Sequence, residues 1–179
     1  MNREQLERLA RGVAMHADPE RGLTNVVVER FCRLIGSPQF AGVFAADCID
    51  ESLASRPSFS MVVNLGEVKG RRRGAPLPVG HFVAVVAAPH AVRYMDSYGL
   101  PCTQRHVARF LRLCGREVRE NTRQVQDYDS KCCGFYASLF ATYYDTARPP
   151  PDFRLVFYRR RLKENDELCF KYLRRLIYS

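Results

Sequence analysis

Four side chains in the sequence have the types and the order needed to hydrolyse an amide bond. They are a histidine, an aspartate, a glutamine and a cysteine that opens an apolar segment: His81, Asp96, Gln126 and Cys133. A thiol hydrolase needs a base, a group that orients the base, a donor for the oxyanion and a nucleophile. The ordered set therefore predicts the chemistry of a cysteine protease.

Cys133 is the expected nucleophile. It opens segment 133–144, which is apolar almost all round and predicts a central, buried helix. At the first turn of a helix, unpaired N–H groups and the positive end of the macrodipole favour a thiolate. Gly134 would let a substrate backbone approach closely. The alternative is a packed core cysteine, and Cys132 serves as a comparison because a glycine does not follow it.

The other three residues are expected to complete the site. His81 begins an apolar strand and would take the thiol proton, then return it to the leaving amine. Asp96 ends the next strand and would hold the imidazole in the productive tautomer if the two strands pair. The Gln126 amide, with the backbone N–H of Cys133, would bind the oxyanion. The alternatives are a histidine bonded to a backbone carbonyl and an exposed turn aspartate.

The elements that must position these residues follow from periodicity. We expect helices over residues 3–16, 24–35, 103–113, 133–144 and 163–177, and an apolar run over 40–46. Strands are expected over 59–65, 81–87, 92–96 and 117–126, with a further short strand over 155–158. Helices at both ends and strands between them indicate a single α+β domain over residues 1–179.

The composition fits an intracellular protein with a sizeable core. The chain has 179 residues, 46% of them hydrophobic, and it shows neither a signal peptide nor an apolar run long enough to span a membrane. Its 7 cysteines include no Cys-x-x-Cys pair and no zinc-finger spacing. We therefore expect reduced thiols and no structural metal.

The net charge of +9 is carried by 24 arginines and 4 lysines. Arginine grips phosphate bidentately, so an arginine-rich surface predicts contact with nucleic acid. Two clusters stand out, a glycine-flanked loop with Arg71, Arg72 and Arg73, and the run Arg159–Arg161. The alternative is a basic, solubilising surface in a GC-rich genome.

With these residues in view, the chain resembles the adenain-like cysteine proteases of adenoviruses, Maverick/Polinton elements and other large DNA viruses. The resemblance is carried by segments 42–47, 62–64, 80–84, 94–101 and 126–136, and above all by the seven-residue step from Gln126 to the Cys133–Gly134 pair. It implies a papain-like site in permuted chain order, built on a mixed central sheet with a buried catalytic helix and flanking helices. Two departures are Phe82, where the family usually has tryptophan, and a shorter C-terminal part.

The resemblance also implies partners. Its members cleave viral precursor proteins during particle maturation, often after a small residue such as glycine, which would place this protein in the host nucleus and virion or the cytoplasm as a monomer. No cofactor is needed for the chemistry, but DNA and a disulfide-linked peptide can stimulate such enzymes. Cys114 aligns near the peptide-bonding cysteine, and a core cysteine at a helix end is the alternative.

Two other functions remain open. A SUMO-type protease shares the residue order but has the glutamine one residue nearer the cysteine, a spacing that Cys132 would restore. A basic DNA-binding virion or chromatin protein would explain the charge, but it would leave the four ordered residues without a role.

Overall fold

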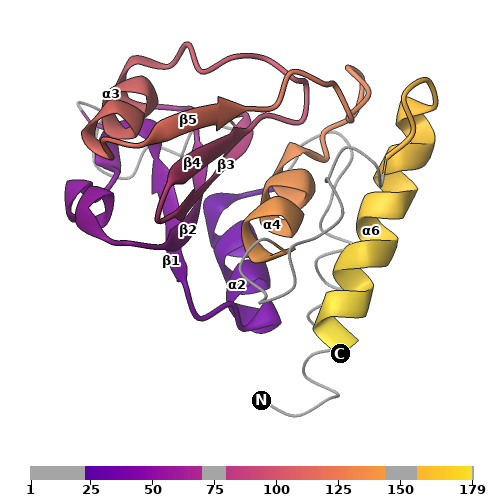
Figure 1. Ribbon diagram of the computed structural model, residues 1–179. Helices are drawn as coiled ribbons and strands as arrows, with labels where there is room; N and C mark the ends of the chain where they lie inside the picture. The colour runs from indigo at the N-terminus through magenta and orange to yellow at the C-terminus, as the bar shows by residue number, and fades with distance from the viewer. Residues whose placement is uncertain (1–22, 70–79, 144–156, 179) are drawn as a thin grey trace.

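A computed structural model describes residues 23–69, 80–143 and 157–178, and it holds all seven cysteines (Figure 1). Two expectations lie outside these residues: the helix over 3–16 and the basic loop with Arg71, Arg72 and Arg73. In the described part of the chain, no helix is both long and apolar enough to cross a membrane.

The centre of the molecule is a five-stranded mixed sheet in the order β1-β2-β3-β4-β5. The outer pairs β1–β2 and β4–β5 are parallel, and the inner pairs β2–β3 and β3–β4 are antiparallel. The strands are β1 Phe40–Ala45, β2 Phe59–Asn64, β3 Phe82–Ala88, β4 Ala91–Met95 and β5 Glu117–Glu120.

Strand register places the expected catalytic pair at one edge of the sheet. A two-residue turn joins β3 to β4, so that Ala88 pairs with Ala91 and Ala84 pairs with Met95. His81 directly precedes β3 and Asp96 directly follows β4. Because the two strands run in opposite directions, both residues lie at the same end of the hairpin.

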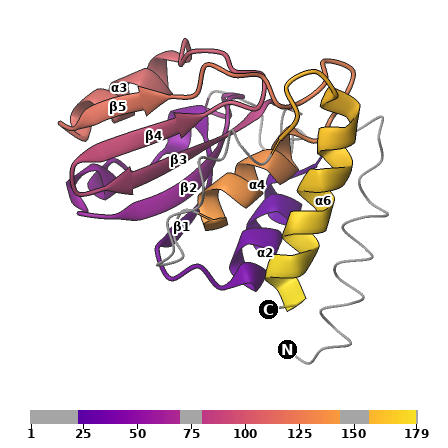
Figure 2. The ribbon, with the colours of Figure 1, turned by 45° about the vertical axis from the view of Figure 1, so that its right-hand side comes forward.

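Side chains alternate between the two faces of the sheet and build two cores. Three helices cover one face, and α3 with two 3₁₀ turns covers the other (Figures 1 and 2). The first group is α2 Asn25–Ile35, α4 Cys133–Tyr143 and α6 Leu162–Tyr178; the second is α3 Arg105–Leu113, η1 Ala46–Cys48 and η2 Glu51–Ser55.

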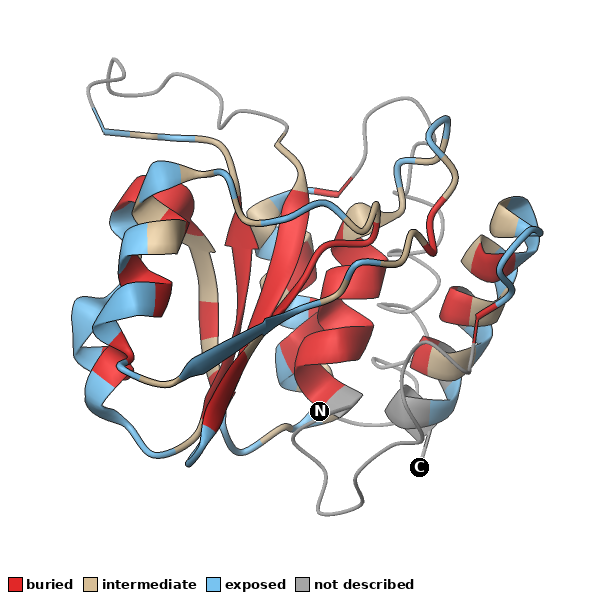
Figure 3. Cartoon of the chain, turned by 45° about the horizontal axis from the view of Figure 1, so that its top comes forward, coloured by how far each residue is buried: buried red, intermediate tan, exposed pale blue. Residues whose placement is uncertain are grey.

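Helix α4 is buried on every side, as its uniformly apolar sequence predicts. Residues 134–142 are all buried, and Figure 3 shows this helix beside the sheet in the colour of buried residues. It packs against β2, β3, α2 and α6. Two of its polar side chains are satisfied within the helix, because Ser138 Oγ donates to Gly134 O (2.7 Å) and Thr142 Oγ1 donates to Ser138 O (2.8 Å). A third, Tyr136, donates its hydroxyl to Asp166 Oδ1 (2.8 Å).

Most expected elements are present, with two differences. The strand expected over 117–126 ends at Glu120, because Asn121 turns its side chain to the backbone of Asp96. In the segment 155–158, residues 155 and 156 lie outside the description, and Phe157 and Tyr158 are not in a strand. The helix expected over 24–35 is present as α2, and Thr24 caps it, since its side chain accepts from Val27 N.

Candidate active site

His81 and Asp96 form a hydrogen-bonded pair at the edge of the sheet. The Nε2 atom of His81 lies 2.9 Å from Oδ1 of Asp96. Asp96 is 2% exposed, whereas His81 keeps partial access to solvent. A carboxylate accepts a hydrogen bond, so this contact assigns the imidazole proton to Nε2 and leaves Nδ1 as an acceptor.

Cys133 reaches the same imidazole from the first turn of α4. Its thiol interacts with the His81 imidazole and acts to raise the pKa of that ring. Since Nε2 is engaged by Asp96, Nδ1 is the ring nitrogen that can accept the thiol proton. The three side chains therefore stand in the order carboxylate, imidazole, thiol, which is the order of a cysteine-protease relay.

The protonated form of His81 is favoured by its two neighbours. Burial of the ring acts to lower its pKa, but hydrogen bonds to Asp96 and Cys133, together with their negative charges, raise it from 6.5 to about 9. An imidazole with this pKa holds a proton at neutral pH. The His81 imidazole can therefore hold the proton of Cys133 until that proton is transferred to the leaving group.

The other six thiols are set apart from Cys133. Removal from water raises the pKa of every one, to about 12 for Cys32 and to about 11 for Cys102 and Cys132. The six are Cys32, Cys48, Cys102, Cys114, Cys132 and Cys169. Because a thiolate is the attacking species, the raised pKa values make these six thiols less reactive at neutral pH than a free cysteine.

Asp96 is held from three sides. Its Oδ1 atom accepts from the backbone N of Tyr98 at 2.7 Å. Asn121 brackets its main chain, accepting from Asp96 N at 2.7 Å and donating to Asp96 O at 2.7 Å. These bonds leave the carboxylate little freedom, so the imidazole that it orients is also fixed.

In the structure, the Gln126 side chain forms hydrogen bonds within the protein, in addition to the oxyanion role expected from sequence. The residue is fully buried, and its Nε2 donates to Ser130 O at 2.8 Å while its Oε1 accepts from Ser97 Oγ at 2.6 Å. These bonds brace the loop that leads into α4. The oxyanion role stays a prediction, and it requires one amide N–H of Gln126 to turn from Ser130 to the substrate.

The reason for a glycine after Cys133 differs from the expected one. Gly134 is buried, and a Cβ atom there would lie 3.0 Å from Leu23 Cδ1 and 3.1 Å from Val28 Cγ2. The missing side chain therefore allows α2 and the residue before its cap to pack closely on α4. The expectation that Gly134 makes room for a substrate backbone is wrong in this respect, because the space is already filled by protein.

The two neighbouring cysteines face different surroundings. Cys132 precedes α4, and its carbonyl accepts from Phe135 N and Tyr136 N. Its thiol interacts with Asp166 on α6, whereas the thiol of Cys133 interacts with His81. The structure therefore brings Cys133, with its seven-residue spacing from Gln126, to the imidazole.

Of the residues expected to contact activators, Cys114 is not part of this cluster. Cys114 ends α3, is 8% exposed and packs in the core on the face opposite α4. This is the setting of the alternative, a core cysteine at a helix end, and a disulfide to a peptide stays a prediction. Arg71, Arg72 and Arg73 lie outside the described residues.

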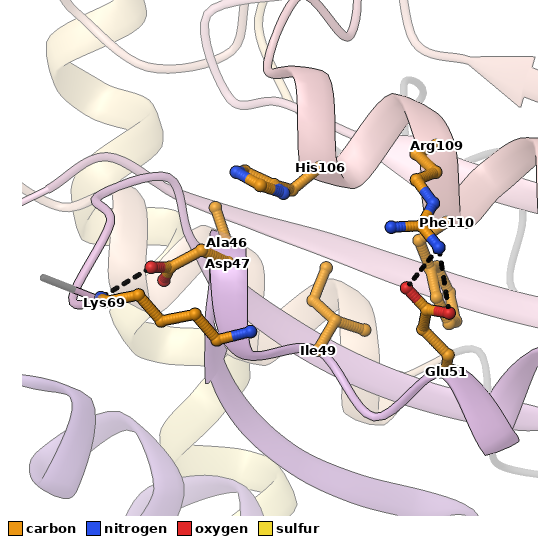
Figure 4. A pocket seen from close by; sticks show the side chains of 8 residues that line it. All are labelled: Ala46, Asp47, Ile49, Glu51, Lys69, His106, Arg109 and Phe110. Carbon is orange, nitrogen blue, oxygen red and sulfur yellow. Dashed lines mark hydrogen bonds and ion pairs between the residues drawn. The ribbon is translucent and has the colours of Figure 1, made fainter.

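A small pocket lies near η1, η2 and α3, on the face away from α4. Its volume is about 140 Å³, and it is shown in Figure 4. Three of its charged side chains interact within the protein, since Arg109 pairs with Glu51 at 3.1 Å and Asp47 accepts the backbone N–H of Lys69. The lining is Ala46, Asp47, Ile49, Glu51, Lys69, His106, Arg109 and Phe110. Within the described residues, no group of three or more His, Cys, Asp or Glu side chains could hold a metal ion.

Comparison with known proteins adds evidence on the fold. Neither a family model nor a curated protein matches the sequence. A structure of the SUMO protease Ulp1, with its catalytic cysteine oxidised to a sulfinic acid, aligns with a TM-score of 0.53 at 13% identity over 99% of this chain and 97% of that one. The chain has the Ulp1 protease fold.

A second structure agrees with this assignment. The C-terminal Ulp1 protease domain in complex with SMT3, the yeast orthologue of SUMO, aligns with a TM-score of 0.52 at 14% identity, over 99% of this chain and 97% of that one. The expected fold class, α+β with a mixed sheet, a buried helix and flanking helices, is confirmed.

Three residues of the site were not singled out from sequence. Tyr98 stacks on His81, Asn121 brackets Asp96, and Ser97 donates to Gln126. Ser97 and Tyr98 follow Asp96 directly, so their proximity could have been inferred from the position of that residue. Asn121 carried a weaker signal, a polar residue that interrupts an expected strand.

Proposed function

We propose that the protein is a cysteine peptidase. The observation that carries the proposal is the relay from Asp96 through His81 to Cys133, with its 2.9 Å carboxylate–imidazole contact, at the mouth of a buried helix. The Ulp1 fold supports it, because those structures carry protease function on the same architecture. A DNA-binding protein without enzymatic activity would have no need of this relay.

The reaction follows from the positions of the three groups. The proton of Cys133 passes to Nδ1 of His81, and the sulfur forms a bond to the carbonyl carbon of the scissile amide. His81 then gives the proton to the leaving amine as the C–N bond breaks, which leaves a thioester. Water, deprotonated by the same imidazole, hydrolyses the thioester and restores the thiol.

The oxyanion of the tetrahedral intermediate needs donors at the helix mouth. The backbone N–H of Cys133 is one candidate, since the first N–H groups of a helix have no partner within it. Gln126 is the second, once an amide hydrogen leaves Ser130. Removal of one such donor reduces turnover by about 10²–10³-fold in related chemistry.

The decisive experiment is selective alkylation of the full chain. Low iodoacetamide at pH about 6, followed by mass spectrometry, is expected to modify Cys133 before the other six thiols, whose pKa values are raised. The variant His81→Ala should abolish the preference. Cys132→Ser is the matched control and should retain it. Slow, uniform labelling of all seven cysteines would refute the proposal.

Two substrate classes are supported by different observations. The resemblance to adenain-like proteases, carried by the seven-residue step from Gln126 to Cys133, supports cleavage of viral precursor proteins after small residues, during virion maturation. The Ulp1 fold over 99% of the chain supports deconjugation of a SUMO-like protein.

A substrate panel separates the two classes. We expect turnover of Gly-Gly peptide esters and of precursor-type polypeptides with internal glycines, and loss of both in Cys133→Ser. Turnover of a SUMO or ubiquitin adduct alone, with the peptides untouched, would assign the protein to the deconjugating class. In either case the same Cys133→Ser variant must be inactive.

A further inference from the structure

Three aromatic rings form a column that ends on the imidazole of His81. The rings of His81 and Tyr98 stack with centroids 4.8 Å apart and planes inclined by 22°. On its other side, Tyr98 stacks on Tyr128 with centroids 5.5 Å apart and an inclination of 18°. Tyr128 is 70% exposed, so the column runs from solvent to the base.

Tyr98 also contacts every other part of the site except the thiol. Its backbone N donates to Asp96 Oδ1 at 2.7 Å. Its Oη atom donates to Ser130 O at 3.2 Å and accepts from Gln126 Nε2 at 3.3 Å. One residue in the turn after β4 therefore connects the base, the carboxylate and the loop that leads to the nucleophile.

Stacking acts on the imidazole in two ways. A ring held against one face of His81 restricts rotation of the imidazole out of the plane that joins Asp96 to Cys133. The π face of a tyrosine is also electronegative and attracts a cation placed over it. Of the ionisable groups facing His81, Asp96 and Cys133 are charged when active, whereas Tyr98 is neutral, so its contribution can be measured separately.

We propose that Tyr98 is the positioning residue of this site: its ring fixes the plane of His81 and favours the imidazolium, and its hydroxyl ties that ring to the loop before Cys133. The inference rests on the proposed function, because Tyr98 acts through the base. The hydroxyl and the ring have separable tasks. Tyr98→Phe keeps the stack and removes the hydrogen bonds, whereas Tyr98→Leu removes both.

The test is an NMR titration of the His81 imidazole in the full chain. A cation–π contact of this kind corresponds to about 0.5–1 pH unit, so Tyr98→Leu should lower the titration midpoint of His81 by that amount. Tyr98→Phe should retain most of the wild-type midpoint. Tyr158→Leu is the matched control, since Tyr158 is exposed and stacks beside Arg161 instead, and it should leave the midpoint unchanged.

A second readout follows the thiol. The upper inflection in the pH profile of Cys133 alkylation, where the imidazolium is lost, should move down by about 0.5–1 pH unit in Tyr98→Leu. If the Tyr98→Leu protein does not fold, the wild-type spectrum still decides. A stacked tyrosine moves the His81 ring protons upfield, and protons at ordinary positions would overturn the stack.

The outcomes separate this inference from the proposed function. Selective, His81-dependent labelling of Cys133 with an unaltered His81 titration in Tyr98→Leu would overturn the role of Tyr98 and leave the peptidase standing. Equal shifts in Tyr98→Phe and Tyr98→Leu would also overturn it, because the hydroxyl and not the ring would then be responsible. If Cys133 is unreactive in the wild-type protein, the proposed function and this inference fail together.

Discussion

At His81, two negative neighbours outweigh the cost of burying a charged ring. The imidazole donates to Asp96 on one side and meets Cys133 on the other, and its pKa is raised to about 9 as a result. The same interactions that prepare the base for catalysis also link protonation of this ring to folding. Activity and stability should therefore share a dependence on pH.

The sign of that dependence can be predicted. A group whose pKa rises on folding stabilises the folded state fully below its ordinary pKa of 6.5, and the contribution fades as the pH rises through about 9. We expect the difference in unfolding free energy between wild type and His81→Gln to shrink from pH 6 to pH 9.5. Urea titrations at several pH values measure it.

Two variants control this measurement. His90 lies exposed in the β3–β4 turn, so His90→Gln is the control for replacing a histidine outside the site. Cys133→Ser removes one of the two causes and should weaken the pH dependence. A difference for His81→Gln that stays constant from pH 6 to 9.5 would contradict the linkage.

Between elements, the decisive contact is the one between α2 and the first turn of α4. Gly134 has no side chain at the point where Leu23 and Val28 press on the helix. The position of Cys133 is therefore set by helix packing, one residue away from the nucleophile. A substitution at Gly134 should therefore change both the unfolding free energy of the protein and the reactivity of the Cys133 thiol.

Gly134→Ala tests this coupling. The added methyl would lie 3.0–3.2 Å from Leu23 and Val28 atoms, tighter than ordinary contact. Overpacking of this kind costs about 1–3 kcal/mol, partly offset by the better helix propensity of alanine, about 1 kcal/mol. We expect a lower unfolding free energy and slower alkylation of Cys133.

The double variant Val28→Ala/Gly134→Ala provides the control. Removing the Val28 methyl groups relieves the clash, so the two substitutions should cost less together than the sum of their separate effects. Denaturant titration of the three variants gives this coupling energy. Strictly additive costs would show that the two side chains do not compete for the same space.

The elements themselves were largely predictable, because each has a repeating pattern. The cap at Thr24, the hairpin turn before Ala91 and the buried α4 all follow from residue type and periodicity. The hairpin alone was enough to bring His81 and Asp96 to one edge of the sheet. The mixed character of the sheet was expected only through the family resemblance.

The segment 121–132 could not be predicted in the same way. Its path is set by bonds between side chains and distant backbone, such as Asn165 Nδ2 to Val125 O at 2.8 Å and Asn121 to Asp96. Such bonds leave no period in the sequence. For this reason the sequence suggested an oxyanion role for Gln126 but did not predict its hydrogen-bond partners in the structure, Ser97 and Ser130.

Over the whole molecule, the basic charge is partly neutralised by local pairs. Five arginines in the described chain contact a glutamate: Arg33, Arg105, Arg109, Arg119 and Arg161. Exposed pairs of this kind contribute little to stability. The run Arg159–Arg161, expected to meet nucleic acid, is exposed directly before α6, and Arg161 is the member that pairs with Glu164.

Salt dependence tests the DNA expectation. Each phosphate neutralised changes the slope of log affinity against log salt by about −0.9. We expect duplex DNA to bind with a steep slope and to raise proteolysis at low salt. The double variant Arg159→Gln/Arg160→Gln should reduce the magnitude of the slope by about 2, as two phosphate contacts are lost.

A paired arginine serves as the comparison. Arg119 contacts Glu117 at 2.7 Å on β5, and Arg119→Gln should change the slope less than the double variant does. Binding that is indifferent to ionic strength would contradict a phosphate-directed surface. The peptidase proposal does not depend on this result, because the relay at Cys133 involves none of these arginines.

Strand β5 has a consequence for the protein at high concentration. It is one of the two edge strands of the sheet, and all four of its residues, Glu117–Glu120, are exposed (Figure 3). An open strand edge is a template on which other chains can add, and charged side chains discourage that addition. Three of these four residues are charged, so their side chains disfavour aggregation by strand addition at the β5 edge of the sheet.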